Sequence, residues 1–251
     1  PNEILILGTG RKKKYIEFFE HPEPKVGAFD GSVKAIGINT DTSSNYLFFM
    51  TKGSNETFVT EINKWPLPSG NTAQQQLMEL VNLDDRLLID TIIDDRIYIK
   101  GNKLDVRKPF IIPSGYTVFF KEGTIMDITS NAMFISYSPV KMMGTQHKPI
   151  IITSSDFTAN GFTVIQGELQ SEVQHVVFEN LNTLNYKGWV ITGAVNFYES
   201  DVSINSTRFY RNQCEDALNI IRSEFIVENC KFDNIYADAF DSDFCSGLVK
   251  N

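Results

Sequence analysis

The chain has 251 residues, of which 42% are apolar and 12% aromatic, enough for one large core or for a solenoid with a small appended domain. Its formal net charge is −8, and its one basic run, Arg11–Lys14, is short. A nucleic-acid-binding protein would carry a basic stripe instead. No apolar run approaches the roughly 18 residues that a membrane-spanning helix needs. We therefore expect neither a nucleic-acid partner nor a membrane span.

Residues 1–70 are expected to form a small β-rich region. Glu3–Gly8, Tyr46–Met50 and Thr57–Ile62 have the composition of strands, and a hairpin signal at Lys52–Asn55 joins the last two. The Pro- and Gly-containing segment that ends at Gly70 marks the boundary of this region. No chemistry can be assigned to it from its residues.

Residues 71–96 are expected to be a helical cap and lead-in. Leu77, Leu80 and Val81 recur at helical spacing between Gln74 and Asn82. We expect this helix to cover the open end of the region that follows, where unpaired strand edges would otherwise promote aggregation. A partner-binding helix is the alternative.

Residues 97–251 carry short strand-like segments with no room for crossover helices between them. Two pairs of segments can be superposed. Val195–Ile204 lies 23 positions before Leu218–Val227, and Glu215–Asn219 lies 22 positions before Ala237–Asp241. A period of 22 to 23 residues indicates a solenoid in which each unit is one coil. The predicted fold class is all-β, a parallel β-helix.

Two stretches resemble the entry coils of right-handed parallel β-helix proteins of the pectate-lyase-like superfamily. Ile111–Val118 followed by Lys121–Thr124 is similar to the pattern Ip-G-tv, e-GT, and Gly144–Ser154 is similar to GT-x-x-x-PI-x-iTS. The resemblance extends over Ile97–Asn251. It implies a right-handed parallel β-helix.

The later coils resemble β-helix modules of secreted bacterial surface proteins. The segments that carry this resemblance are Phe197–Ser200 and Glu215–Asn219. Some of those proteins are joined to spore-coat-H-type kinase-like domains, and no kinase-like portion is recognisable in this chain. The resemblance implies an extracellular or cell-surface location. It does not imply one activity, because the architecture hosts lyases, hydrolases, epimerases, adhesins and scaffolds.

Alternation of side chains along each strand predicts the interior of the coils. The positions expected to point inward are Val195, Phe197, Leu218, Ile220, Phe240 and Phe244. Val202 and Ile204 are expected to stack on Phe225 and Val227, and Phe178, Phe209 and Phe232 on one another. Asn180, Asn212 and Asn234 follow those phenylalanines, which predicts a ladder of turn asparagines.

The same alternation predicts two outward columns near the last coils. Asn196, Asn219 and Asp241 form one column, and Tyr198, Ile221 and Asp243 form the next. Asp216 and Asp238 precede two of these strands and are expected to stack, with Glu215 and Arg222 close by. An acidic outer surface results.

Three interpretations of this acidic surface stay open. It is a hydrated face with acids that cap turns, or a Ca²⁺ site formed by Asp216, Asp238, Asp241 and Asp243, since Ca²⁺ takes several carboxylate oxygens. In the third, it is catalytic. Two carboxylates would act as acid and base on a glycosidic bond, or Ca²⁺ would assist proton abstraction beside a uronate carboxyl. The candidates are Asp241, Asp243, Arg222 and Lys231, although the high pKa of arginine makes it a poor base.

Aromatic residues lie beside the acidic surface. The insertion Leu184–Thr192 lengthens one coil and contains Tyr186 and Trp189. Such side chains stack sugar rings when exposed and are core when buried. The predicted carbohydrate-binding set is Tyr186, Trp189, Tyr198, Asn196 and Asn219.

Two functions of different classes are therefore predicted. The first is a secreted or cell-surface module that binds carbohydrate or serves as a scaffold. The second is a polysaccharide lyase or glycoside hydrolase that acts on an acidic glycan. Phe225–Val227 maps 23 residues on to Leu248–Lys250, so the sequence stops partway through a coil. We expect either further C-terminal coils or an end-to-end contact with another chain at this edge.

Overall fold

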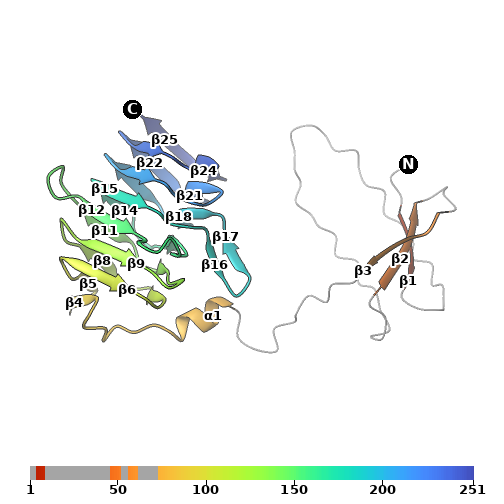
Figure 1. Cartoon of the computed structure of the whole chain (residues 1–251), viewed down its shortest axis with the longest axis horizontal. Helices are drawn as coiled ribbons and strands as arrows, with labels where there is room; N and C mark the ends of the chain where they lie inside the picture. The colour runs from red at the N-terminus through yellow and green to blue at the C-terminus, as the bar shows by residue number, and fades with distance from the viewer. Residues whose placement is uncertain (1–3, 9–45, 52–55, 62–72) are drawn as a thin grey trace. The chain divides into compact units, whose positions relative to one another are not determined.

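The computed structural model describes residues 4–8, 46–51, 56–61 and 73–251 (Figure 1). The chain divides into two compact units, Pro1–Ser69 and Gly70–Asn251. The predicted turn at Lys52–Asn55, the boundary segment before Gly70 and the basic run Arg11–Lys14 lie outside the described residues.

The first unit contains a three-stranded antiparallel sheet in the order β1–β2–β3. Its strands are β1 (Ile4–Gly8), β2 (Tyr46–Thr51) and β3 (Phe58–Glu61). β2 pairs with β3 in antiparallel register, Tyr46 opposite Glu61 and Phe49 opposite Phe58. The predicted strands and their hairpin pairing are therefore confirmed.

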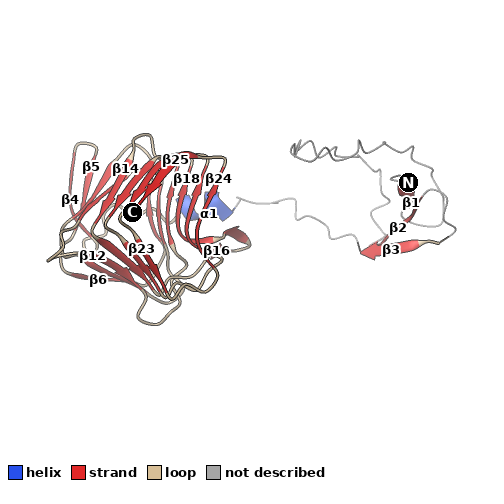
Figure 2. Ribbon diagram, turned by 90° about the horizontal axis from the view of Figure 1, so that it is seen from above, coloured by secondary structure: helices blue, strands red, loops and turns tan. Residues whose placement is uncertain are grey.

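The second unit is a parallel β-solenoid of about seven turns, and its three sheets run along the solenoid. Figure 2 shows these sheets around one common interior. The first sheet consists of β7 (Phe110–Ile112), β10 (Phe134–Ser136), β13 (Phe162–Ile165), β18 (Gly193–Tyr198), β21 (Asp216–Ile221) and β24 (Asp238–Asp243). The all-β parallel-helix prediction is confirmed.

The other two sheets complete each turn. The second sheet consists of β4 (Ile89–Ile93), β5 (Arg96–Ile99), β8 (Thr117–Phe120), β11 (Val140–Met143), β14 (Ser171–Gln174), β19 (Val202–Asn205), β22 (Glu224–Glu228) and β25 (Ser246–Lys250). The third sheet consists of β6 (Lys103–Val106), β9 (Ile125–Ile128), β12 (Ile150–Thr153), β15 (Val176–Glu179), β20 (Arg208–Tyr210) and β23 (Lys231–Asp233). Within the second sheet, β4 is antiparallel to β5, so a hairpin occupies the start of that sheet.

Stacked side chains of like kind fill the interior, because every coil places the same inward position above the previous one. The predicted phenylalanine stack is confirmed. The rings of Phe178 and Phe209 are 5.5 Å apart, and those of Phe209 and Phe232 are 4.7 Å apart with only 7° between their planes. Val202 and Ile204 pair with Phe225 and Val227, also as predicted.

The corners of the coils are made by single residues in the left-handed backbone region. After the first sheet these are Gln166, Glu199, Arg222 and Phe244, with φ between 48° and 55°. The prediction that Phe244 points inward is wrong, because the strand ends at Asp243 and Phe244 occupies the corner with 86% of its surface exposed. The inward position belongs to Ser242, which pairs with Ile220.

Two further register predictions need correction. The corner column after the third sheet is Asn180, Arg211 and Asn234, with φ of 59°, 51° and 53°. Asn212 lies one position later, where its buried side chain accepts a hydrogen bond from the Leu181 amide. At the last coil the offset is 22, not 23, because Phe225 pairs with Gly247 and Ile226 with Leu248.

A short helix and a hairpin lie on the outer face of the first sheet. The helix α1 (Ala73–Met78) is shorter than predicted. The Asp84 amide donates to Asn82 Oδ1, a local turn that competes with further helix. The hairpin consists of β16 (Leu184–Tyr186) and β17 (Trp189–Ile191), which pair antiparallel within the predicted insertion.

Candidate functional site

The hairpin and the helix cover part of the first sheet with a second hydrophobic cluster. Leu77 of α1 and Leu184 of the hairpin are fully buried against outward-facing residues of the early strands, Ile111, Met133, Ile135 and Ile165. Tyr186, Trp189 and Tyr198 are partly buried at the margin of this cluster. In Figure 1 the hairpin descends from the level of β18 toward α1.

Polar side chains continue the same outward column toward the last coils. Ile111 and Ile135 occupy it in the early coils. Thr163, Asn196, Asn219 and Asp241 follow in register on β13, β18, β21 and β24. The prediction that Asn196, Asn219 and Asp241 form one outward column is confirmed. Asn196 and Asn219 are nevertheless only 0% and 2% exposed, because this face is covered and is not a free surface.

Hydrogen bonds join this column to the start of β21. The Asn196 side-chain amide donates to Thr163 Oγ1 (3.0 Å) and to the Gly193 carbonyl (2.8 Å). Asn219 Nδ2 donates to Thr192 Oγ1 (2.9 Å) and to Asp216 Oδ2 (3.2 Å). The Thr192 hydroxyl also donates to Asp216 Oδ2, at 2.8 Å. We call Thr163, Thr192, Asn196, Asp216 and Asn219 the amide–carboxylate network.

Gly193 is required for the network to form. A Cβ at this position would lie 2.2 Å from Asn196 Oδ1 and 2.7 Å from Asn219 Cβ. Such contacts are far inside van der Waals distance, so any other residue would displace both asparagines. Glycine here permits the close approach of two side chains from adjacent strands.

The network is short of hydrogen-bond donors. Asn196 Oδ1 and Asn219 Oδ1 are buried and accept no hydrogen bond within the described structure. Buried polar atoms are usually satisfied, and an exception in a native protein calls for an explanation such as a bound group. The network therefore has acceptors for which the described residues supply no donor.

Asp216 is the most unusual member of the network. It is 3% exposed, and no basic side chain of the described residues forms an ion pair with it. Its pKa is raised above the ordinary aspartate value, mainly by burial. The hydrogen bond from Thr192 opposes this shift, whereas the negative charges of Asp241, Glu215 and Asp238 add to it.

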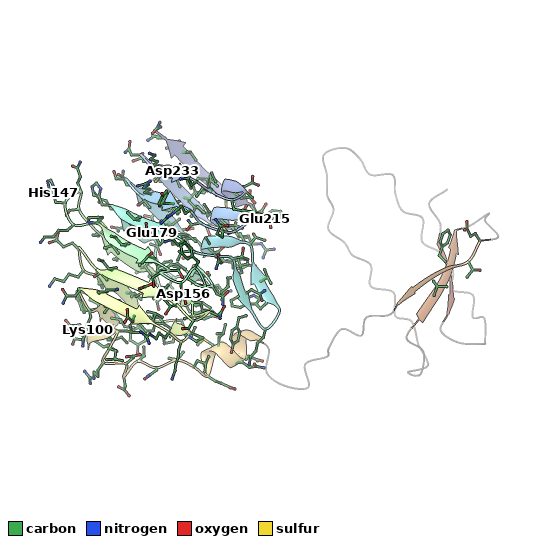
Figure 3. The ribbon with its side chains drawn as sticks, in the orientation of Figure 1. Lys100, His147, Asp156, Glu179, Glu215 and Asp233 are labelled. Atoms are coloured by element: carbon green, nitrogen blue, oxygen red, sulfur yellow. The ribbon has the colours of Figure 1, made fainter. Side chains whose placement is uncertain are left out.

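The other predicted acids lie along the edge of the first sheet. Asp216 and Asp238 are register partners at the starts of β21 and β24, and Asp241 and Asp243 follow along β24. Figure 3 shows Glu215 beside this end of the sheet. Across residues 73–251 and the described strands of the first unit, no three His, Cys, Asp or Glu side chains are grouped so as to hold a metal ion.

The basic candidates are not brought together. Arg222 lies at the corner after β21, where Nη1 donates to the Tyr198 hydroxyl (3.1 Å) and to Glu199 Oε1 (3.3 Å). Lys231 lies on β23 of the third sheet, 3.7 Å from Asp233. Lys231 and Asp241 therefore belong to different sheets, and Arg222 is already paired.

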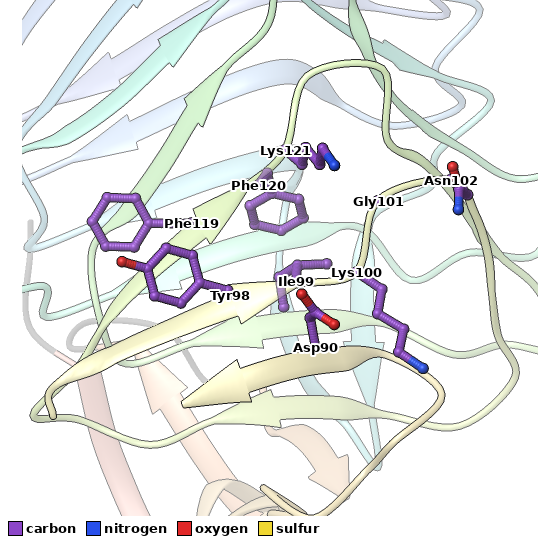
Figure 4. A pocket seen from close by; sticks show the side chains of 9 residues that line it. All are labelled: Asp90, Tyr98, Ile99, Lys100, Gly101, Asn102, Phe119, Phe120 and Lys121. Carbon is purple, nitrogen blue, oxygen red and sulfur yellow. The ribbon is translucent and has the colours of Figure 1, made fainter. Parts of the chain in front are cut away.

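A pocket of about 660 Å³ lies elsewhere, at the first turn of the solenoid (Figure 4). Tyr98 and Phe119 stack there with ring centroids 5.2 Å apart, and Asp90, Lys100 and Lys121 lie around the opening. The sequence did not single out this pocket, because its lining comes from strands in two different coils. Its two lysines reach solvent, and it contains no buried polar group without a partner among those described.

No protein-family model, curated protein or solved structure matches this chain. Among the described residues, no helix is long and apolar enough to cross a membrane.

Three members of the site escaped the sequence prediction. Thr163, Thr192 and Gly193 are common residue types, and Thr163 lies one long coil before Asn196. Only the register of β13 on β18 places Thr163 beside Asn196. The sequence does contain one signal for these residues, the pair Thr192-Gly193 at the end of the insertion. A glycine at the start of a strand often marks a place where another part of the chain approaches the backbone closely.

Proposed function

We propose that this chain is a secreted or cell-surface β-solenoid module that binds a carbohydrate on the outer face of its first sheet. The observations that carry the proposal are the partly buried aromatic residues Tyr186 and Trp189 of the hairpin and, at the last strand of the same sheet, the partly exposed Asp241 beside the exposed Asp238. A sugar ring presents hydroxyl groups at its edge and apolar C–H groups on its faces. A surface with carboxylates and half-buried aromatic rings complements both kinds of group. The resemblance to modules of secreted surface proteins supports the location.

Binding to a glycan panel tests this proposal. We expect Trp189→Ala to weaken binding of the best glycan by about tenfold, the cost of one aromatic contact of roughly 1.5 kcal/mol. The matched control is Tyr210→Ala, which removes an aromatic ring from the third sheet, where it lies between Arg208 and Arg211. Equal effects of the two substitutions, or no binding to any glycan, would contradict the proposed function. In the second case a scaffold role is the alternative.

A polysaccharide-active enzyme is the second candidate, and the environment of Asp216 favours it. A buried carboxyl with a raised pKa beside other carboxylates is the arrangement that a general acid needs. Asp241, opposite Asn219, is the neighbouring carboxylate that would act as base or nucleophile.

The enzyme candidate has a separate test. Release of reducing ends and of ultraviolet-absorbing unsaturated products is measured on neutral, amino and uronate polysaccharides, with and without Ca²⁺. We expect Asp216→Asn to abolish any activity found, with Asp105→Asn on the third sheet as the control of equal charge change. If a glycan binds but is not turned over, the proposal of an enzyme is wrong and the proposal of a binding module stands.

A further inference from the structure

Asp216 is a buried carboxylate without a cation. Its Oδ2 atom accepts hydrogen bonds from Thr192 and Asn219, both neutral donors. Buried charges in proteins are normally paired, because an isolated charge in a medium of low polarity is costly. Within the described residues no lysine, arginine or histidine pairs with Asp216. The partner that this geometry requires is missing from the described chain.

The neighbouring charges make the site strongly negative. Asp238 lies opposite Asp216 on the adjacent strand, and Asp241 lies opposite Asn219. Adjacent strands are about 4.8 Å apart, so these carboxylates act on one another at short range. The exposed Glu215 precedes Asp216 directly in the chain.

Basic side chains on the surrounding elements do not neutralise this charge. Arg222, at the corner after β21, is held by Glu199 and Tyr198. Lys187, at the tip of the hairpin, donates to Gln76 of α1 and lies over the Tyr186 ring. An anionic glycan such as a polyuronate would be repelled here.

A second feature points to the same kind of ligand. Asn219 is only 2% exposed, and its Nδ2 atom donates to Asp216 Oδ2 while its buried Oδ1 atom accepts no hydrogen bond within the described structure. The cluster therefore has a surplus of acceptors and of negative charge. An ammonium group supplies one positive charge and three donors. A divalent cation fits less well, since it needs several convergent oxygens and the described acids are not grouped in that way.

We propose that the exposed Asp238 and the partly exposed Asp241, next to the buried Asp216 at the end of the network, bind the ammonium group of an amino sugar, so that the ligand is a glycan with free amines. This inference rests on the proposed carbohydrate-binding function and names its ligand class. It names a cationic glycan, whereas the enzyme predicted from the sequence as the alternative function would act on an acidic one. Further sugars of a longer glycan would extend along the hairpin toward Tyr186 and Trp189, which lie near its tip.

Calorimetric titration with matched oligosaccharides tests the inference. The probes are a β-1,4-linked glucosamine pentamer, its fully N-acetylated form, and an oligogalacturonate with and without Ca²⁺. We expect the glucosamine pentamer to bind at least about tenfold more tightly than the acetylated form, since a charge-assisted hydrogen bond is lost on acetylation. We expect no binding of the galacturonate.

Substitutions locate the effect. Asp216→Asn and Asp241→Asn are each expected to reduce the preference for the free amine to less than about twofold, whereas Asp105→Asn leaves it unchanged, because Asp105 lies on the third sheet. Thermal unfolding confirms that each variant is folded. If Asp216→Asn destabilises the chain, Asp241→Asn still tests the inference, because Asp241 is only partly buried and its substitution is expected to leave the fold intact.

The outcomes separate the two proposals. Equal binding of the free and acetylated pentamers would overturn the amine inference and leave carbohydrate binding intact. So would an amine preference that persists in the folded Asp216→Asn and Asp241→Asn variants, or Ca²⁺-dependent binding of the galacturonate. Absence of binding to any of the probes and to the wider glycan panel would overturn both proposals.

Discussion

At the residue scale, the behaviour of the site depends on where charge is buried. Alternation along β21 and β24 was enough to align Asn219 with Asp241. It gave no information on the burial of Asn219, whose amide is held by Thr192 at the end of the hairpin segment that precedes β18. Asn196 and Asn219 therefore belong to an enclosed network. Two small residues, Gly193 and Thr192, determine how closely the side chains of this network approach one another.

The raised pKa of Asp216 predicts a pH-dependent stability. Above the ordinary aspartate value of 3.8 the unfolded chain has lost this proton while the folded chain still holds it. The free energy of unfolding therefore falls as the pH rises through the interval between the two pKa values, and the loss is complete above the folded pKa. Asp216→Asn removes this dependence, so the variant gains stability relative to the wild type as the pH rises.

Urea unfolding of both proteins across the acidic and neutral range measures this difference. The negative charges of Asp241, Glu215 and Asp238 add to the raised pKa of Asp216 and so to the expected effect. Asp105→Asn is the control, with an exposed carboxylate on the third sheet. A loss of stability of Asp216→Asn relative to the wild type as the pH rises would mean that the pKa of Asp216 is lowered in the folded protein.

At the element scale, the coils were predictable and the covering of the first sheet was not. The repeat at 22 to 23 residues reflects a local rule, since each coil must place like residues above one another. The docking of Leu184 against Ile135 and Ile165 is a contact between non-adjacent segments that leaves no period in the sequence. The missed corner position of Asn212 has a local cause, because the corner residue follows the stacked phenylalanine by two positions in all three coils, whereas Asn212 follows Phe209 by three.

The hairpin offers a direct test of this covering. Leu184→Ala is expected to destabilise the solenoid by about 2–5 kcal/mol, because a fully buried leucine leaves a cavity between the hairpin and the sheet. Val190→Ala in the same hairpin is the matched control, with 49% of the side chain exposed and an expected change within about 0.5 kcal/mol. Denaturant midpoints compare the two. Equal, small effects would show that the hairpin is not packed on the sheet in solution.

At the scale of the whole molecule, stability should vary along the solenoid. Each coil packs mainly on its two neighbours, so a coil with one neighbour is held less firmly. The middle coils carry fully buried Phe162, Val164 and Phe178. In the last described coil, β23 to β25, the inward residue Val249 pairs with the buried Val227 and is itself 59% exposed.

Hydrogen exchange is expected to follow this gradient. Amides of Ser246–Lys250 should exchange fastest within the second sheet, those of Glu224–Glu228 more slowly, and those of Ser171–Gln174 most slowly. Addition of a chain that covers the edge of β25 would protect Ser246–Lys250 selectively. Uniform protection along the second sheet of the isolated 251-residue chain would contradict this gradient. It would show that the solenoid opens as one cooperative unit, because coupling between neighbouring coils would then hold the last coil as firmly as the middle coils.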